Sequence, residues 1–300
     1  MNTRIKHLEK EIKELKKQKF NTEHLEMSLS ILKQEYHSQL SSWDKVQLAR
    51  AKDRAGSKQF IEAIFTDFTE LHGDRNYGDD GAILGGIAHL HDMPVTVIGV
   101  VKGQTTEENL KSNFGMVHPE GYRKALRLMK QAEKFNRPII TLIDTPGAYP
   151  GIGAEERGQG QAIAQNLVSM MDLKVPVIAI ILGEAGSGGA LALAVANQVW
   201  MMEHAIYSIL SPEGFASILY KDASKAPEIV DDMKITSDHL FALGLIDEVI
   251  EEKDDFVPVA KYLKARLYRE LSAMKKMKAK QIQKQRYERF RNIGEVIHEK

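Results

Sequence analysis

The sequence predicts an α/β protein built on a largely parallel β-sheet. Short apolar runs alternate with longer amphipathic segments between residues 83 and 252. The runs have the length of strands, and the segments between them have the length of helices. Two of the runs, 138–144 and 175–184, are apolar almost throughout. Such runs are typical of strands that are buried on both faces of a parallel sheet.

Residues 1–42, which precede this region, predict a charged helical hairpin. In the first helix, apolar residues recur at spacings of three and four and form one narrow seam. This seam consists of Ile5, Leu8, Ile12 and Leu15. A second helix follows, with Asn21 or Thr22 as its expected cap. Its apolar positions are Leu25, Leu29, Leu32, Tyr36 and Leu40. We expect the hairpin to pack on the main body or on a partner.

The central segment, residues 43–255, carries the strands and helices of the α/β domain. In chain order, the expected strands are 83–90, 95–103, 138–144, 175–184 and 245–252. The expected helices are 118–137, 154–172, 186–196, 212–220 and 236–244. Two helices have clear start signals, because Pro119 and Pro212 occupy first helical positions and Ser211 precedes Pro212 as an N-cap.

From roughly Val259 the chain returns to charged helix, rich in Lys and Arg. We therefore assign residues 256–300 to a C-terminal helical extension. Together with the hairpin, this gives three segments: 1–42, 43–255 and 256–300.

The composition excludes several classes of function. Lys and Arg total 41 and Asp and Glu total 41, so the chain carries no net charge that would draw it to nucleic acid or to an anionic membrane. No cysteine is present, which excludes disulfides, thiolate metal sites and a catalytic thiol within this chain. The only paired histidines, His89 and His91, have no third ligand nearby in sequence, so we expect no metal. The first residues do not resemble a signal peptide, and no apolar run is long enough to cross a bilayer. We expect a cytoplasmic protein.

The stretch "GEAGSGGALALA", Gly183–Ala194, contains the strongest candidate for chemistry. As a phosphate loop it would need Lys and Ser or Thr where Gly189 and Ala190 stand. Residues Asp144–Gly147 match a GTPase switch motif, but they precede the glycine loop instead of following it. A nucleotide-hydrolysing domain is therefore disfavoured.

A second interpretation makes Ser187 the nucleophile of a hydrolase. A serine between a strand and a helix has the right local geometry for a nucleophile elbow. Such an enzyme also needs a histidine and an acid downstream, and neither His204 nor His239 lies in a specialised context. This alternative stays open.

A third interpretation assigns the chemistry to the main chain. The first N–H groups of a helix have no intrahelical partner and carry the positive end of the helix dipole. Gly186, Gly188 and Gly189 have no Cβ, so an oxygen of a ligand can approach these amides closely. Such amides stabilise an oxygen that gains negative charge during a reaction. Glycine that merely allows close helix–sheet packing is the simpler alternative.

With these residues assembled, the chain resembles the carboxyltransferase alpha subunits of acetyl-CoA carboxylase from bacteria and plastids. The similarity covers about residues 43–249. The matching stretches are Trp43–Arg50, Glu70–Arg75, Asn113–Phe135, Ile143–Ala164, Gly183–Leu193 and Tyr207–Asp222.

The resemblance implies a crotonase-like fold of the ClpP/crotonase type, with stacked ββα units and glycine-bearing helix starts that form oxyanion holes. It implies transfer of a carboxyl group from carboxybiotin, held on a biotin carboxyl carrier protein, to acetyl-CoA, which gives malonyl-CoA for fatty-acid synthesis. It further implies an α2β2 assembly with a beta subunit that carries the zinc ribbon, and biotin carboxylase in the larger complex. The lack of cysteine in this chain agrees with a zinc site elsewhere.

By this resemblance the backbone amides of Gly186, Gly188 and Gly189 are the catalytic donors, on the biotin side of the active site. Residues expected to bind substrate around them are Ala185, Ser187, Gly147, Ala148, Tyr149, Gly151, Pro212, Glu213 and Gly214. The family usually has glycine where this chain has Ala185, which can donate its N–H only if its φ is negative. A non-catalytic relative that binds the beta subunit is the remaining alternative.

Overall fold

The computed structural model describes residues 3–38, 40–252 and 255–294. They divide into two compact units, Met1–Asp44 and Lys45–Lys300, and the short helix α3 (Ser42–Ala49) contains the boundary. The C-terminal helices belong to the second unit. The division into segments 1–42, 43–255 and 256–300 stays a prediction.

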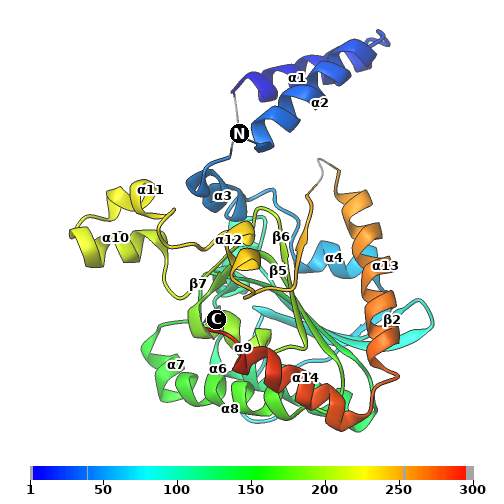
Figure 1. Cartoon of the computed structure of the whole chain (residues 1–300), viewed down its shortest axis with the longest axis vertical. Coiled ribbons are helices and arrows are strands. Elements are labelled where there is room, and N and C mark those ends of the chain that lie inside the picture. Colours follow the sequence, from blue (N-terminus) through cyan, green and yellow to red (C-terminus); the bar gives the residue numbers. More distant parts are fainter. Residues whose placement is uncertain (1–2, 39, 253–254, 295–300) are drawn as a thin grey trace, which may run out of the picture. The chain divides into compact units, whose positions relative to one another are not determined.

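The first unit is a pair of helices, α1 (Thr3–Lys17) and α2 (Glu23–Ser38), which lie side by side (Figure 1). Ile5 and Ile12 of the predicted seam are buried. The side chain of Asn21 accepts a hydrogen bond from the Glu23 amide at 2.9 Å, as expected of a residue at the start of a helix.

In the second unit, eight strands of the described part of the chain form one mixed sheet in the order β1-β2-β3-β4-β5-β6-β8, with β7 paired to β5. The strands are β1 (Thr66–Glu70), β2 (Ile83–Leu90), β3 (Met93–Val100), β4 (Ile139–Thr145), β5 (Val177–Gly186), β6 (Gln198–Met202), β7 (Ile206–Ser208) and β8 (Glu248–Ile250). The first three strands pair antiparallel, and the pairs from β3 onward are parallel. The predicted α/β class with a largely parallel sheet is confirmed.

Helices cover both faces of this sheet. In chain order, they are α4 (Ser57–Ile64), α5 (Thr106–Lys111), η1 (Asn113–Gly115), α6 (Pro119–Lys134), α7 (Ile152–Glu156), α8 (Gln159–Asp172), α9 (Ser187–Ala194), α10 (Pro212–Tyr220), η2 (Ala223–Lys225), α11 (Ala226–Ile229), α12 (Ser237–Ala242), α13 (Phe256–Met274) and α14 (Ala279–Arg291). Gly85, which pairs with Ile98, faces Leu128 of α6, whereas the next residue of β3, Gly99, faces Ser57 of α4. Because successive strand residues point to opposite faces, α4 and α6 lie on opposite sides of the sheet.

The core lies along β4 and β5. Every residue of β4 is buried, and β5 is buried from Val177 to Gly183. Strands of this kind need helices to cover them; α4 packs on β4, and α9 packs on both β4 and β5. The carboxyl ends of β4 and β5 therefore meet at one edge of a rigid layer.

One helix that the sequence predicts is divided into two helices in the structure. Residues 154–172 were expected to form a single helix, but α7 ends at Glu156 and α8 starts at Gln159. Gly158 between them has φ +84°, a left-handed conformation that glycine adopts without strain. The side chain of Gln159 is buried and donates to the carbonyl oxygens of Val117 and Tyr149. These tertiary contacts fix the start of α8.

Candidate active site

The turn from β5 into α9 holds the three glycines that the sequence singled out. Gly186 ends β5 in an extended conformation, and Ser187 begins α9 with φ +51°. In the described part of the chain, no side chain caps this helix start. The first amides of α9 thus have neither an intrahelical acceptor nor a side-chain cap, and they lie at the positive end of the helix dipole.

Two of the glycines are required by close packing. A Cβ on Gly186 would clash with the carbonyl oxygen of Pro146. A Cβ on Gly189 would lie 2.5 Å from the amide nitrogen of Ala148 and 2.8 Å from the hydroxyl of Tyr122. The turn therefore rests directly on the loop that follows β4, and the packing role of glycine applies at these two positions.

Gly188, unlike Gly186 and Gly189, is not required by close packing. A Cβ there would lie 3.7 Å from Ile163, an ordinary van der Waals contact. Gly188 also borders an open cavity. At this position the missing side chain is not needed for packing, which leaves access to the main chain as the physical reason for glycine.

A cavity of about 320 Å³ lies against the turn. Its lining residues are Arg50, Pro146, Glu184, Ala185, Gly186, Ser187, Ile206, Ser208, Ile209, Leu210, Ser211 and Pro212. Four of the predicted site residues, Ala185, Gly186, Ser187 and Pro212, are thus brought together. Ala185 has no positive φ, and it lies within the sheet in register with Thr145 and Tyr207.

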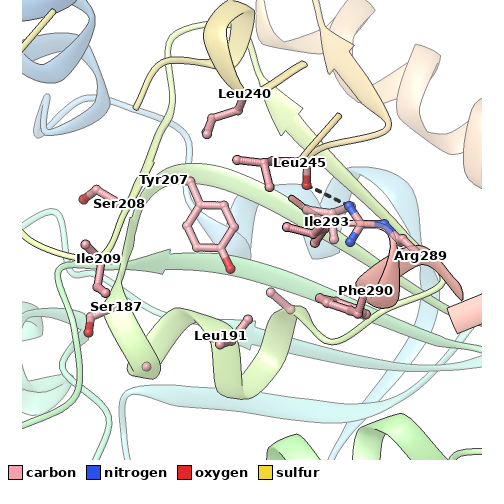
Figure 2. Close-up of a pocket in the computed structure, with 13 residues that line it drawn as sticks. Ser187, Leu191, Tyr207, Ser208, Ile209, Leu240, Leu245, Arg289, Phe290 and Ile293 are labelled. Atoms are coloured by element: carbon pink, nitrogen blue, oxygen red, sulfur yellow. Dashed lines mark hydrogen bonds between the residues drawn. The ribbon is translucent and has the colours of Figure 1, made fainter. Parts of the chain in front are cut away.

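A second cavity, of about 550 Å³, also borders Ser187, and Gly188 is among the residues that line it. Figure 2 shows Leu191 and Tyr207 between Ser187 at one end and Phe290 at the other. Its walls are mostly apolar. The guanidinium of Arg289 at its far end is already paired with Asp247 at 2.8 Å and with the carbonyl oxygen of Leu245.

The predicted wall after β4 is held by its own hydrogen bonds. The Gly147 amide donates to the Thr145 hydroxyl at 3.1 Å, and Gly147 has φ +148°. The Tyr149 amide donates to the carbonyl oxygen of Val117, and its ring stacks on His118 with centroids 4.1 Å apart. Gly151 is the residue before α7, and a Cβ there would clash with the Tyr149 ring. These residues support the wall beside the turn, and the Gly147 and Tyr149 amides already have acceptors.

Helix α10 begins as the sequence predicts. Ser211 caps it by accepting a hydrogen bond from the Gly214 amide at 3.1 Å, and Pro212 is its first residue. The Gly214 amide is therefore used within the fold. The two carboxylate oxygens of Glu213 accept hydrogen bonds from the Arg50 guanidinium at 2.6 and 3.2 Å.

Arg50 belongs to a charged network that sequence reasoning missed. Lys102 lies 2.8 Å from Asp144 and 2.9 Å from Glu184, and Arg50 lies 2.7 Å from Glu184. The Glu184 amide also donates to Asp144 at 3.0 Å. With Glu213, the network holds two positive and three negative groups directly before the glycine turn. The sequence signal that could have revealed the network is a charged residue within two positions of the carboxyl end of each of β3, β4 and β5.

Neighbouring groups of the network shift the pKa values of Lys102, Glu184 and Glu213. Burial would lower the pKa of Lys102, but the charges of Asp144 and Glu184 outweigh it and raise that pKa above its ordinary value. Burial would likewise raise the pKa of Glu184, but Lys102 and Arg50 lower it. For Glu213, the hydrogen bond from Arg50 is the main cause of a lowered pKa. The ions thus stabilise one another in a site where a lone ion would be costly.

The two histidines considered for the hydrolase alternative, His204 and His239, do not lie beside Ser187. His204 lies in the loop after β6 near Glu203, and His239 contacts the Thr236 hydroxyl. Neither is among the residues that line the two cavities beside Ser187. A Ser–His pair for the hydrolase alternative is therefore not formed among these residues.

The described residues contain no cluster of three or more His, Cys, Asp or Glu side chains placed to hold a metal ion. The helices among them are all too short or too polar to span a membrane.

The mixed sheet, with a glycine turn after a buried parallel strand, has the fold of the crotonase-like carboxyltransferases. Solved structures with this fold include a transcarboxylase 12S, with a TM-score of 0.59 and 21% identity over 72% of this chain. This chain spans 42% of that transcarboxylase chain. A Pseudomonas malonate decarboxylase hetero-tetramer gives a TM-score of 0.58 and 18% identity, over 70% of this chain and 86% of that one.

Within this class, the chain belongs to the acetyl co-enzyme A carboxylase carboxyltransferase-like family, whose model matches residues 1–294. Two relatives are acetyl-coenzyme A carboxylase carboxyl transferase subunits alpha. The one from Ruminiclostridium cellulolyticum is 55% identical over 86% of this chain and 99% of its own length. The one from Clostridium perfringens (strain ATCC 13124) is 58% identical over 84% of this chain and 95% of its own length. The family and fold expected from the sequence are confirmed, and the chain is a transferase subunit.

Proposed function

We propose that this chain is the alpha half of a carboxyltransferase that moves a carboxyl group from carboxybiotin to acetyl-CoA and so forms malonyl-CoA for fatty-acid synthesis. Its biotin is a substrate that arrives on a biotin carboxyl carrier protein and is not attached to this chain. The observation that carries the proposal is the uncapped start of α9, with Gly186 and Gly188 each lining a cavity and Gly189 buried beside them. The names of the family and of its relatives support the same reaction.

The chain's own contribution is electrostatic. Carboxyl transfer from a urea nitrogen leaves negative charge on the ureido oxygen, which must be stabilised while the acetyl group loses a proton. The amides at Gly186, Gly188 and Gly189 are suited to this task because their dipoles are fixed before the substrate arrives. Loss of one such donor typically costs about 3 kcal/mol of transition-state stabilisation. The base is supplied by the substrate, since a decarboxylated ureido nitrogen can accept the acetyl proton.

The proposal makes this chain half of an active site. The name "subunit alpha" of the relatives implies a partner subunit. In our proposal the partner is a carboxyltransferase beta subunit in an α2β2 assembly, which binds acetyl-CoA and malonyl-CoA and stabilises the thioester enolate. Biotin carboxylase completes the larger complex. We place the assembly in the cytoplasm, with no role for nucleic acid or membrane binding.

Reconstitution tests the proposal. The chain by itself should make little malonyl-CoA. Mixed with a competent beta subunit from a close relative, it should restore carboxyl exchange between malonyl-CoA and a biotinyl substrate such as biocytin. Failure of the mixture to exchange carboxyl groups, with both proteins folded and associated, would contradict the proposal.

A variant at Gly188 separates a catalytic chain from a relative that only binds the partner. Gly188→Leu places a branched side chain over the first amides of α9 and should lower carboxyl exchange at least 100-fold, while association with the beta subunit is kept. Gly160→Leu is the matched control, because Gly160 lies exposed in α8 with open space at its Cβ position. Equal activity of the two variants would indicate that the chain binds the beta subunit without taking part in catalysis.

A further inference from the structure

Arg50 connects two parts of the site that are far apart in sequence. It follows α3, and its amide donates to the Val46 carbonyl oxygen, so the start of its side chain is fixed by a helical turn. Its guanidinium then spans two carboxylates. Nε donates to Glu184 at 2.7 Å, and the two terminal nitrogens donate to Glu213 at 2.6 and 3.2 Å. Glu184 lies two residues before Gly186, and Glu213 lies in the first turn of α10.

Helix α10 has few other attachments to the sheet. It packs against η2 and α11. Figure 1 shows α10 and α11 together, away from the helices that cover the sheet. Apart from the cap at Ser211, the pair between Glu213 and Arg50 is, among the described residues, the only side-chain hydrogen bond or ion pair that joins α10 to a residue outside that helix. The outward side chains Ile218 and Leu219 are more than half exposed. The orientation of α10 therefore depends strongly on one residue.

The electrostatics make this connection specific for arginine. Without Arg50, Glu184 and Glu213 would be two like charges, and Lys102 would be the cation paired with Glu184 among the described residues. A planar guanidinium can bind two carboxylates at once, whereas an ammonium group offers a single point of charge. Ser211 and Pro212 at the start of α10 line the 320 Å³ cavity together with Gly186 and Ser187. A shift of α10 would thus change the mouth of that cavity.

We propose that Arg50 is a positioning residue: it ties α10 to the strand that precedes the glycine turn, so that α10 forms a lid whose placement sets access to the 320 Å³ cavity. The effect on carboxyl transfer rests on the function proposed above, but the effect on α10 does not. Arg50 itself need not touch the reacting atoms. Its loss should loosen the lid and weaken capture of the biotinyl substrate, while the amides of α9 stay in place.

The absence of cysteine in this chain allows a direct test of lid mobility. A single spin label at Leu219→Cys reports on α10, and one at Lys284→Cys on α14 serves as the reference. We expect Arg50→Gln and Glu213→Gln to add a more mobile component to the spectrum at position 219 and to leave position 284 unchanged. An unchanged spectrum at position 219 in both variants would overturn the proposal. Glu213→Gln keeps the test valid if Arg50→Gln fails to fold, since the Glu213 side chain is 39% exposed.

Kinetics of the complex with the beta subunit provide the second readout. We expect Arg50→Gln to lower kcat/KM for the biotinyl substrate about tenfold, mainly through a higher KM, with the KM for malonyl-CoA unchanged. Arg50→Lys should recover part of the loss. Lys284→Gln, which removes an exposed ion pair on α14, is the control. A merely structural role would reduce the amount of active enzyme and so lower kcat with KM unchanged, and that result would overturn the proposal. If wild-type complex shows no exchange at all, the proposed function fails while the spin-label result stands.

Discussion

Gly186 and Pro146 are in direct backbone contact: a Cβ on Gly186 would overlap the carbonyl oxygen of Pro146. Neither group belongs to a flexible side chain, so neither can move aside without displacing a strand end. The contact joins the end of β5 to the loop after β4, and it places the start of α9 against that loop. The amides of the turn are therefore held by a rigid layer and not by a free loop.

This contact predicts a contrast between two glycines. Gly186→Ala should lower the free energy of unfolding by about 2–4 kcal/mol, because the new methyl group forces the strand end away from Pro146. Gly188→Ala should leave stability unchanged or raise it by up to about 1 kcal/mol, because alanine favours helix and its Cβ would make only an ordinary van der Waals contact with Ile163. Chemical denaturation of the two variants measures both. Equal losses would mean that Gly188 is also packed.

Ser187 is predicted to work through its backbone and not through its hydroxyl. No histidine lines the two cavities beside it, so the described residues offer no Ser–His pair that would activate the hydroxyl. Ser187→Ala should therefore retain kcat within about threefold in the complex, and a fluorophosphonate probe should not label the wild-type chain. Labelling that disappears in Ser187→Ala would restore the hydrolase alternative.

The fold was largely predictable because its signals are local. Apolar runs of strand length predicted β2 to β5, and Pro119 and Ser211 marked helix starts correctly. The break between α7 and α8 was missed because the amphipathic pattern continues across it. What interrupts the helix is the left-handed Gly158 and the buried hydrogen bonds of Gln159, whose acceptors Val117 and Tyr149 lie 42 and 10 positions away.

The site was predictable in part. The glycine pattern located the turn, but it did not distinguish Gly188 from Gly186 and Gly189, since that difference depends on atoms of the neighbouring loop. The left-handed φ of Ser187 has no sequence signal, because serine rarely adopts it. Arg50 was noted only within a matching stretch. Its role requires Glu184 and Glu213, which lie 134 and 163 residues away.

Stability at acid pH should depend on Asp79. Burial would raise the pKa of Asp79, but hydrogen bonds from Lys124, the Gly73 amide and His72 lower it from 3.8 to about 2. A carboxylate whose pKa is lower in the folded state than in the unfolded state stabilises the fold at pH values above its unfolded-state pKa. This stabilisation is lost as the pH falls from about 4 to about 2. Because the Asp79 side chain is 38% exposed, solvent screening reduces the contribution to about 1 kcal/mol.

Asp79→Asn tests this assignment. The difference in unfolding free energy between wild type and variant should be about 1 kcal/mol at pH 6 and should shrink as the pH falls through the window from 4 to 2. Urea titrations at several pH values measure it. A difference that stays constant across this window would show that Asp79 does not titrate with a lowered pKa in the folded chain.

Tyr122 carries a polar group that the fold does not use. Its side chain is fully buried next to Gly189, and its hydroxyl has no hydrogen-bond partner among the residues that the structure describes. Burial raises the pKa of this phenol, so it stays neutral. Because a buried hydroxyl without a partner costs free energy, Tyr122→Phe should raise the free energy of unfolding by about 1 kcal/mol.

Tyr268→Phe is the matched contrast, because the Tyr268 hydroxyl donates to Asp92 at 2.9 Å, and its loss should lower stability slightly. If Tyr122→Phe instead destabilised the chain by more than 1 kcal/mol, the hydroxyl would have to serve the glycine turn directly.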